Sequence, residues 1–182
     1  MKMNKKRLIA GLVLFTVAAA SGLVILTPNP FSEMVISRAQ AMGYVSYSAD
    51  EAMALAYGRC TQCHSDEKIL KYCSRCGPPF IVVTSTMRKY IDLSKTQGLE
   101  IEQFTDAEIV AITQTWNALI GNWEKDWPKK DLKKLLGRDQ ALIRLLEIPV
   151  EERPIEMALK NKSASGAYQR YGLGEKRDNA GQ

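Results

Sequence analysis

Two cysteines and a histidine stand together in a pattern that could do chemistry. Residues 60–64 read Cys-Thr-Gln-Cys-His, which is the C-x-x-C-H sequence to which c-type haem is attached. The thiols of Cys60 and Cys63 are spaced to reach the two vinyl groups of one porphyrin, and the adjacent imidazole of His64 can bind the iron as its proximal ligand. His64 is the only histidine in the chain of 182 residues. The motif therefore predicts one covalently attached haem c, held by these three residues.

A second C-x-x-C pair follows closely, at Cys73 and Cys76. In an oxidising compartment this pair is expected to form a local disulfide that stiffens the loop beside the haem. A working redox disulfide that exchanges electrons with the haem is a sharper alternative. The four cysteines together could instead form a four-thiolate zinc site, although that arrangement leaves His64 without a role.

The N-terminus predicts export. Residues 8–26 are nineteen consecutive residues without a charge, which is enough for a helix to cross a bilayer. The four basic side chains within residues 1–7 hold that end in the cytoplasm, so the remainder is expected on the periplasmic side of the cytoplasmic membrane. An uncleaved single-pass anchor is favoured over a signal peptide cleaved near residues 18–20. Export and the haem motif agree, because haem c is attached outside the cytoplasmic membrane.

The charge distribution excludes several classes of function. The formal net charge is +5, but the excess of basic side chains lies in residues 1–7 and 160–182. Residues between these ends carry slightly more acidic than basic side chains, so no nucleic-acid partner is expected. Because the only histidine belongs to the haem motif, a hydrolase triad is also excluded. The chain is therefore expected not to be an enzyme.

Two capping-box patterns mark the starts of helices that could position the motif. Ser48 with Glu51 opens a predicted helix that ends at about residue 57, just before the motif. Thr105 with Glu108 opens a second, predicted to run to about residue 119 with Trp116 on its apolar stripe. Apolar spacing predicts a further helix over residues 131–147. Residues 81–93 are also expected to be helical, although residues 81–84 are β-branched, and a loop over residues 60–80 joins this segment to the motif. No strand pattern occurs, so the predicted fold class is all-α.

Residues 49–121 resemble a monohaem class I c-type cytochrome. The resemblance rests on the helix that leads into the motif, on the loop after it, and on the closing helix that Phe104-Thr105-Asp106-Ala107-Glu108-Ile109 opens. It implies that a methionine between the motif and the closing helix is the sixth ligand of the iron. Met87 is the only such residue in that stretch.

Other assignments of the sixth position stay open. Met87 could be an ordinary core residue, a thiolate of Cys73 or Cys76 could bind the iron, or the position could be open. Near the motif, Pro78, Pro79 and Phe80 are expected to line the edge of the haem.

The expected organisation is a single N-terminal transmembrane helix, a small cytochrome c-like domain and a C-terminal helical extension. The segments are a membrane anchor or signal segment (1–27), a linker (28–47), the haem domain (48–122), the helical extension (123–159) and a flexible basic tail (160–182). Pro28 and Pro30 are expected to prevent a helix in the linker.

The resemblance implies transfer of single electrons at the outer face of the cytoplasmic membrane. The protein is expected to act as a tethered carrier or as a subunit of a respiratory or photosynthetic complex. Its partners would then be membrane-bound or periplasmic redox proteins. The alternative is a haem enzyme, or a redox or gas sensor, whose labile sixth ligand is coupled to Cys73 and Cys76.

Overall fold

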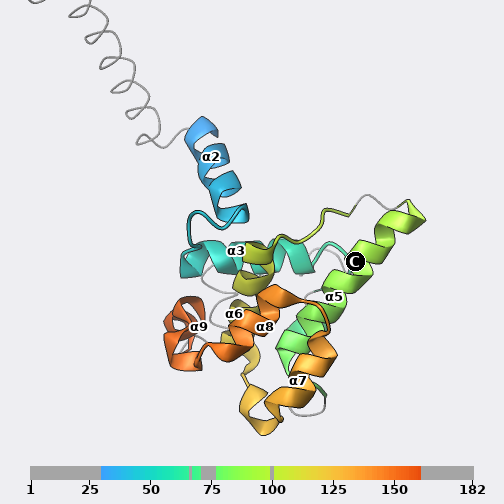
Figure 1. Cartoon of the computed structure of the whole chain (residues 1–182). Helices are drawn as coiled ribbons and strands as arrows, with labels where there is room; N and C mark the ends of the chain where they lie inside the picture. The colour runs from blue at the N-terminus through green and yellow to red at the C-terminus, as the bar shows by residue number, and fades with distance from the viewer. Residues whose placement is uncertain (1–29, 66, 71–76, 99–100, 161–182) are drawn as a thin grey trace, which may run out of the picture. The chain divides into compact units, whose positions relative to one another are not determined.

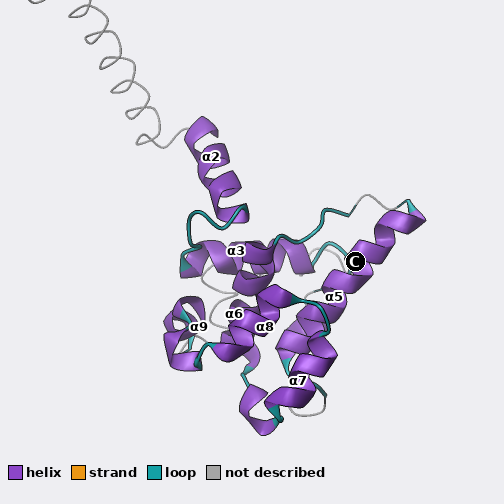
Figure 2. Ribbon diagram, viewed as in Figure 1, coloured by secondary structure: helices purple, strands orange, loops and turns teal. Residues whose placement is uncertain are grey.

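The computed structural model describes residues 30–65, 67–70, 77–98 and 101–160 (Figure 1). Every regular element in these residues is a helix and none is a strand, which confirms the predicted all-α class (Figure 2). No helix in this part of the chain is long and apolar enough to cross a membrane. The predicted anchor over residues 8–26 lies outside the described residues, as does the predicted tail from residue 161 onward.

The helices follow one another with short connections. In chain order they are α2 (Pro30–Ala41), α3 (Ala49–Cys60), α4 (Glu67–Leu70), α5 (Phe80–Ser94), the 3-10 turn η1 (Lys95–Gln97), α6 (Asp106–Ile120), η2 (Glu124–Asp126), α7 (Lys129–Leu136), α8 (Gln140–Glu147), η3 (Val150–Glu152) and α9 (Pro154–Leu159).

The chain divides into two compact units between Val45 and Ser46. In the first unit the described element is α2, which occupies much of the segment predicted as a linker. The expectation that prolines prevent a helix there was wrong for residues 30–41. Pro30 is the first residue of α2, where its missing N–H would have no helical partner and its fixed φ already suits a helix.

Both predicted capping boxes are confirmed in the second unit. The Ser48 side chain accepts a hydrogen bond from the Glu51 backbone N–H, and the Glu51 carboxylate accepts one from the Ser48 N–H. Thr105 and Glu108 make the same reciprocal pair at the start of α6. These bonds satisfy backbone donors that have no partner within the helix, so both helices begin where the local sequence predicts.

Helix α6 is the central element of the second unit and packs against α3, α5, α8 and α9 (Figure 1). Nearly all of its residues from Glu108 to Asn117 are buried, and Trp116 is in the core as predicted. Residues Ile81 and Val82 belong to the same core, which explains why a β-branched stretch folds as the first turn of α5. Tertiary burial outweighs the modest helix propensity of these residues.

The predicted helix over residues 131–147 is two helices in the structure. Gly137 ends α7 with a φ of 65°, a conformation that residues with a Cβ rarely adopt. Asp139 then caps α8 by accepting a hydrogen bond from the Leu142 N–H. The break turns the apolar faces of both helices inward, because Leu132, Leu136 and Leu142 are all fully buried. The C-terminal extension therefore shares one hydrophobic core with α5 and α6.

Candidate functional site

The C-x-x-C-H motif begins at the last residue of α3. Cys60 ends the helix, and Thr61 caps it with both its N–H and its hydroxyl donating to the Tyr57 carbonyl, at 3.1 and 2.9 Å. The backbone then turns, which leaves Cys60 half-buried and Cys63 exposed. A helix end followed by a tight turn thus presents both thiols and His64 on one short stretch of backbone.

A cavity of about 430 Å³ opens beside this turn. Its walls come from the end of α3, the motif, α4, α5, the connection that precedes α6, and α6 itself. The lining residues are Arg59, Cys60, Cys63, His64, Lys68, Ile69, Phe80, Val83, Thr84, Met87, Tyr90, Ile91, Ile101, Phe104, Ile109 and Ile112. The cavity therefore brings together the four residues that the sequence predicted as haem ligands or attachment points, although Met87 is distant from the motif in sequence.

Met87 reaches this cavity because of the period of α5. The residues of α5 that line the cavity recur three or four positions apart and so share one face of the helix; they are Phe80, Val83, Thr84, Met87, Tyr90 and Ile91. The Met87 side chain is 38% exposed, so the alternative of an ordinary core methionine is wrong. Its thioether is available to a ligand in the cavity.

The hydrogen bond of His64 suits a metal ligand. Its Nδ1 lies 3.1 Å from the backbone oxygen of Ser65. With the proton on Nδ1 donated to that carbonyl, the lone pair of Nε2 is free to bind a metal.

The Cys60 thiol is kept protonated by its surroundings. Burial raises its pKa to about 11, outweighing the lowering effects of the Trp116 indole N–H and of Arg59, while Cys63 adds a smaller raising effect. A thiol in this state is a poor nucleophile at neutral pH, so the site does not favour cysteine catalysis.

The cavity carries two cationic side chains, Arg59 and Lys68, and no carboxylate among the described residues that line it. The Arg59 guanidinium donates to the Glu102 carboxylate and to the Gln103 carbonyl, and it lies over the Phe104 ring with its central carbon 5.2 Å from the ring centroid. These contacts join the motif to the segment that precedes α6.

Sequence reasoning missed several wall residues. It gave Arg59 no role, and it did not single out Ile101 or Phe104 as wall residues. The signal available in the sequence was the position of Arg59, a basic residue directly before the first cysteine of the motif. Of the three residues expected at the haem edge, Phe80 lines the cavity, whereas Pro78 and Pro79 are not among the described residues of its wall.

The second cysteine pair, Cys73 and Cys76, lies outside the described residues. The predicted disulfide, its redox alternative, the thiolate ligand and the zinc site therefore all stay predictions. Within the described ranges, no three His, Cys, Asp or Glu side chains form a group that could hold a metal ion.

Comparison with known proteins adds no family assignment. No protein-family model matches the chain, and neither the curated proteins nor the solved structures contain a significant match.

Proposed function

We propose that the protein is a monohaem c-type cytochrome that transfers single electrons. Cys60 and Cys63 would form the thioether links, His64 would be the proximal ligand, and Met87 would be the distal ligand. The observation that supports this proposal is that all four side chains line one and the same cavity.

The residues of the cavity fit a haem in size, polarity and charge. Its volume lies within the usual range for cofactor sites, about 300–1,000 Å³, and its walls are predominantly aliphatic and aromatic. The two propionate groups of a haem are anionic, and the described wall carries the cations of Lys68 and of Arg59, the second of which already pairs with Glu102 and Glu108. A protonated Cys60 thiol also suits attachment, in which the S–H adds across a vinyl double bond without net oxidation.

The side chains of the site would support electron transfer in distinct ways. When bound, the haem would supply a one-electron ferric–ferrous couple. His64 and Met87 would both hold the iron, so no ligand exchange would be needed. Ile109, Ile112 and Phe80 would exclude water from the iron, and a thioether ligand favours the ferrous state and raises the reduction potential.

We further propose that residues 8–26 tether the haem domain to the outer face of the cytoplasmic membrane. A tether raises the effective concentration of the domain near membrane-bound redox partners. Retention of the protein in the membrane fraction after an alkaline wash supports the tether. Mature protein that begins after residue 20 contradicts it.

Covalent haem is the property that tests the proposal most directly. We expect the purified full-length chain to keep its haem in a denaturing gel and to give a c-type spectrum in alkaline pyridine. Cys60→Ala should weaken or abolish covalent attachment, whereas Gln62→Ala, at an exposed position between the two cysteines, should not. Full-length protein made with the haem-attachment machinery but lacking haem would overturn the proposal. Ready binding of CO to the ferrous form at neutral pH would favour an enzyme or sensor instead.

A further inference from the structure

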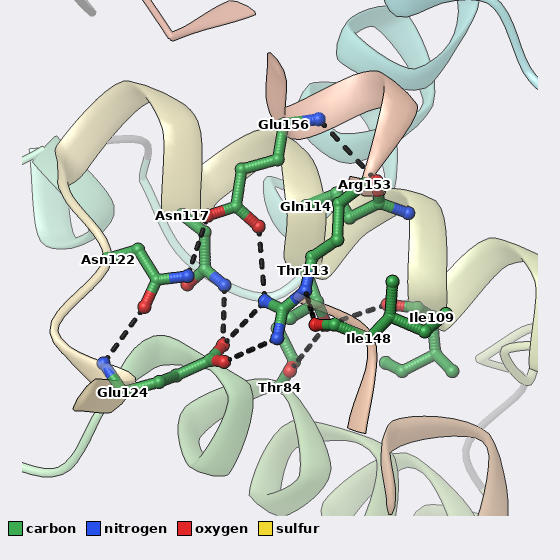
Figure 3. A network of polar contacts seen from close by, with 10 residues as sticks. All are labelled: Thr84, Ile109, Thr113, Gln114, Asn117, Asn122, Glu124, Ile148, Arg153 and Glu156. Atoms are coloured by element: carbon green, nitrogen blue, oxygen red, sulfur yellow. Dashed lines mark hydrogen bonds and ion pairs between the residues drawn. The ribbon is translucent and has the colours of Figure 1, made fainter. Parts of the chain in front are cut away.

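A buried ionic cluster lies where the C-terminal extension meets α6 (Figure 3). The Arg153 guanidinium makes a bidentate pair with the Glu124 carboxylate, at 2.7 and 3.1 Å, and a single bond of 3.2 Å to the Glu156 carboxylate. The exposed fractions of the three side chains are only 2%, 6% and 4% for Arg153, Glu124 and Glu156. Two carboxylates therefore share one cation away from water.

The two carboxylates are not held equally. Glu124 receives both arms of Arg153 and a third bond of 2.8 Å from the Asn117 amide. Glu156 receives only one Arg153 bond and a bond of 2.6 Å from the Asn122 amide. Hydrogen bonds to a carboxylate favour its ionised form, and Glu156 accepts fewer of them than Glu124 does.

Electrostatics agree with this geometry. Burial is the largest effect and raises the pKa of Glu156. The Asn122 hydrogen bond and the Arg153 charge lower it, and the Glu124 charge raises it.

The charged groups that act on Glu156 in the described chain are thus Arg153 and Glu124. Of the other elements packed against α9, η3 carries two exposed carboxylates, Glu151 and Glu152, whereas the neighbouring groups of α6 and α3 are neutral. Gln114 of α6 accepts from the Glu156 backbone N–H, and α3 contributes Ala52 and Met53 to an apolar cluster with residues of α9.

Helix α6 connects this cluster to the cavity. Ile109 and Ile112 line the cavity, while Gln114 and Asn117 reach the cluster. At 3.6 residues per turn and about 1.5 Å of rise per residue, these two pairs lie on roughly opposite sides of α6 and about 7 Å apart along its axis, so more than one helix diameter of about 10 Å separates the cluster from the cavity. A charge in a water-poor interior acts over such a distance more strongly than it does in water.

We propose that Glu156 is a proton-binding site linked to the oxidation state of the iron in the cavity. This inference rests on the proposed function. One electron from a redox partner converts ferric to ferrous iron, and the loss of positive charge is offset in part by uptake of a proton from water onto the Glu156 carboxylate. The Asn122 side chain, which donates a hydrogen bond to that carboxylate, is half-buried.

The sign of the linkage follows from electrostatics. An ionised Glu156 stabilises ferric iron, so the midpoint potential should fall as the pH rises through the ionisation of Glu156. A neutral side chain at this position should remove that fall.

Potentiometric titration of the full-length, detergent-solubilised holoprotein over a range of pH tests the proposal. Over the pH range in which the midpoint potential of the wild type falls, we expect that of the Glu156→Gln protein to stay nearly constant. Its value should be close to that of the wild type at low pH. Glu152→Gln replaces an exposed carboxylate of the neighbouring turn and should behave like the wild type. A Glu156→Gln profile parallel to that of the wild type would show that the proton binds elsewhere and would overturn the inference.

A measurement on the wild-type protein avoids dependence on the folding of the variant. Redox-difference infrared spectroscopy should show a protonated carboxyl band that gains intensity on reduction. Its absence would contradict the proposal. Absence of haem from the protein would contradict the proposed function itself. The haem-stained gel detects that outcome separately.

Discussion

At the scale of single residues, the site combines side chains whose chemical states suit different tasks. His64 is oriented by a backbone carbonyl, and the Cys60 thiol is held protonated by burial. Met87 presents a partly exposed thioether on the cavity face of α5. These states are set by immediate surroundings, so single substitutions can test them.

Replacement of Met87, the proposed distal ligand, should alter the spectrum without unfolding the protein. We expect Met87→Leu to abolish the weak far-red band of Met-ligated ferric haem and to allow CO to bind the ferrous form. Met157→Leu is the matched control, because Met157 in α9 is also 38% exposed but does not line the cavity. An unchanged far-red band in Met87→Leu would exclude Met87 as the ligand.

Removal of the shared cation of the buried cluster should be costly. Arg153→Met leaves two carboxylates buried without a positive charge, and we expect a loss of about 3–5 kcal/mol in the free energy of unfolding. Urea unfolding followed by circular dichroism measures this loss. Lys133→Met, which removes an exposed partner of Glu147, should leave the midpoint nearly unchanged. Equal effects of the two substitutions would contradict a structural role for the cluster.

At the scale of elements, glycine has opposite roles at two helix positions. Gly58 lies within α3 and an added Cβ would meet open space, whereas Gly137 ends α7 with positive φ. We expect Gly58→Ala to stabilise the protein by about 0.4–1 kcal/mol through reduced freedom of the unfolded chain. Gly137→Ala should destabilise it by about 1–3 kcal/mol. If both substitutions shifted the urea midpoint in the same direction, the positive φ of Gly137 between α7 and α8 would be contradicted.

The extension should behave as part of the core rather than as an appendage. Leu142 of α8 is fully buried, and Leu142→Ala should cost about 2–5 kcal/mol. Leu135 of α7 is 42% exposed, so Leu135→Ala should cost clearly less. Thermal unfolding in which α8 and the proposed haem site unfold in one transition would support one cooperative unit. Separate transitions would contradict it.

At the scale of the whole molecule, the cluster around Arg153 should influence how stability depends on pH. The pKa of Glu156 is raised in the folded chain, so the folded state binds its proton more tightly than the unfolded state does. The stabilisation is therefore complete below the ordinary glutamate pKa and is lost as the pH rises through the folded pKa.

Unfolding free energies measured against pH check this sign. We expect the wild type to lose stability over that window, and we expect Glu156→Gln to lose less. A steeper decline in the variant would mean that ionised Glu156 stabilises the fold.

Local sequence was sufficient for the features that depend on neighbouring residues. The C-x-x-C-H spacing, the two capping boxes and the apolar period of α5 and α6 each involve residues within a few positions of one another. The all-α class followed from these patterns. Local patterns also misled, because Pro30 permits a helix at its first position and Gly137 divides a continuous apolar period into two helices.

Only the tertiary structure decided which distant residues meet. Met87 reaches the motif because α5 packs against α6, and Arg59 meets Glu102 across 43 positions of sequence. Arg153 and Glu124 are 29 positions apart, and nothing in their local sequence indicates that they pair. Spacing along the chain determines local geometry, whereas burial and charge pairing between distant segments depend on how the helices pack. For this chain, the sequence by itself determined the predicted attachment of haem, and the packing determined the cavity and the buried cluster around Arg153.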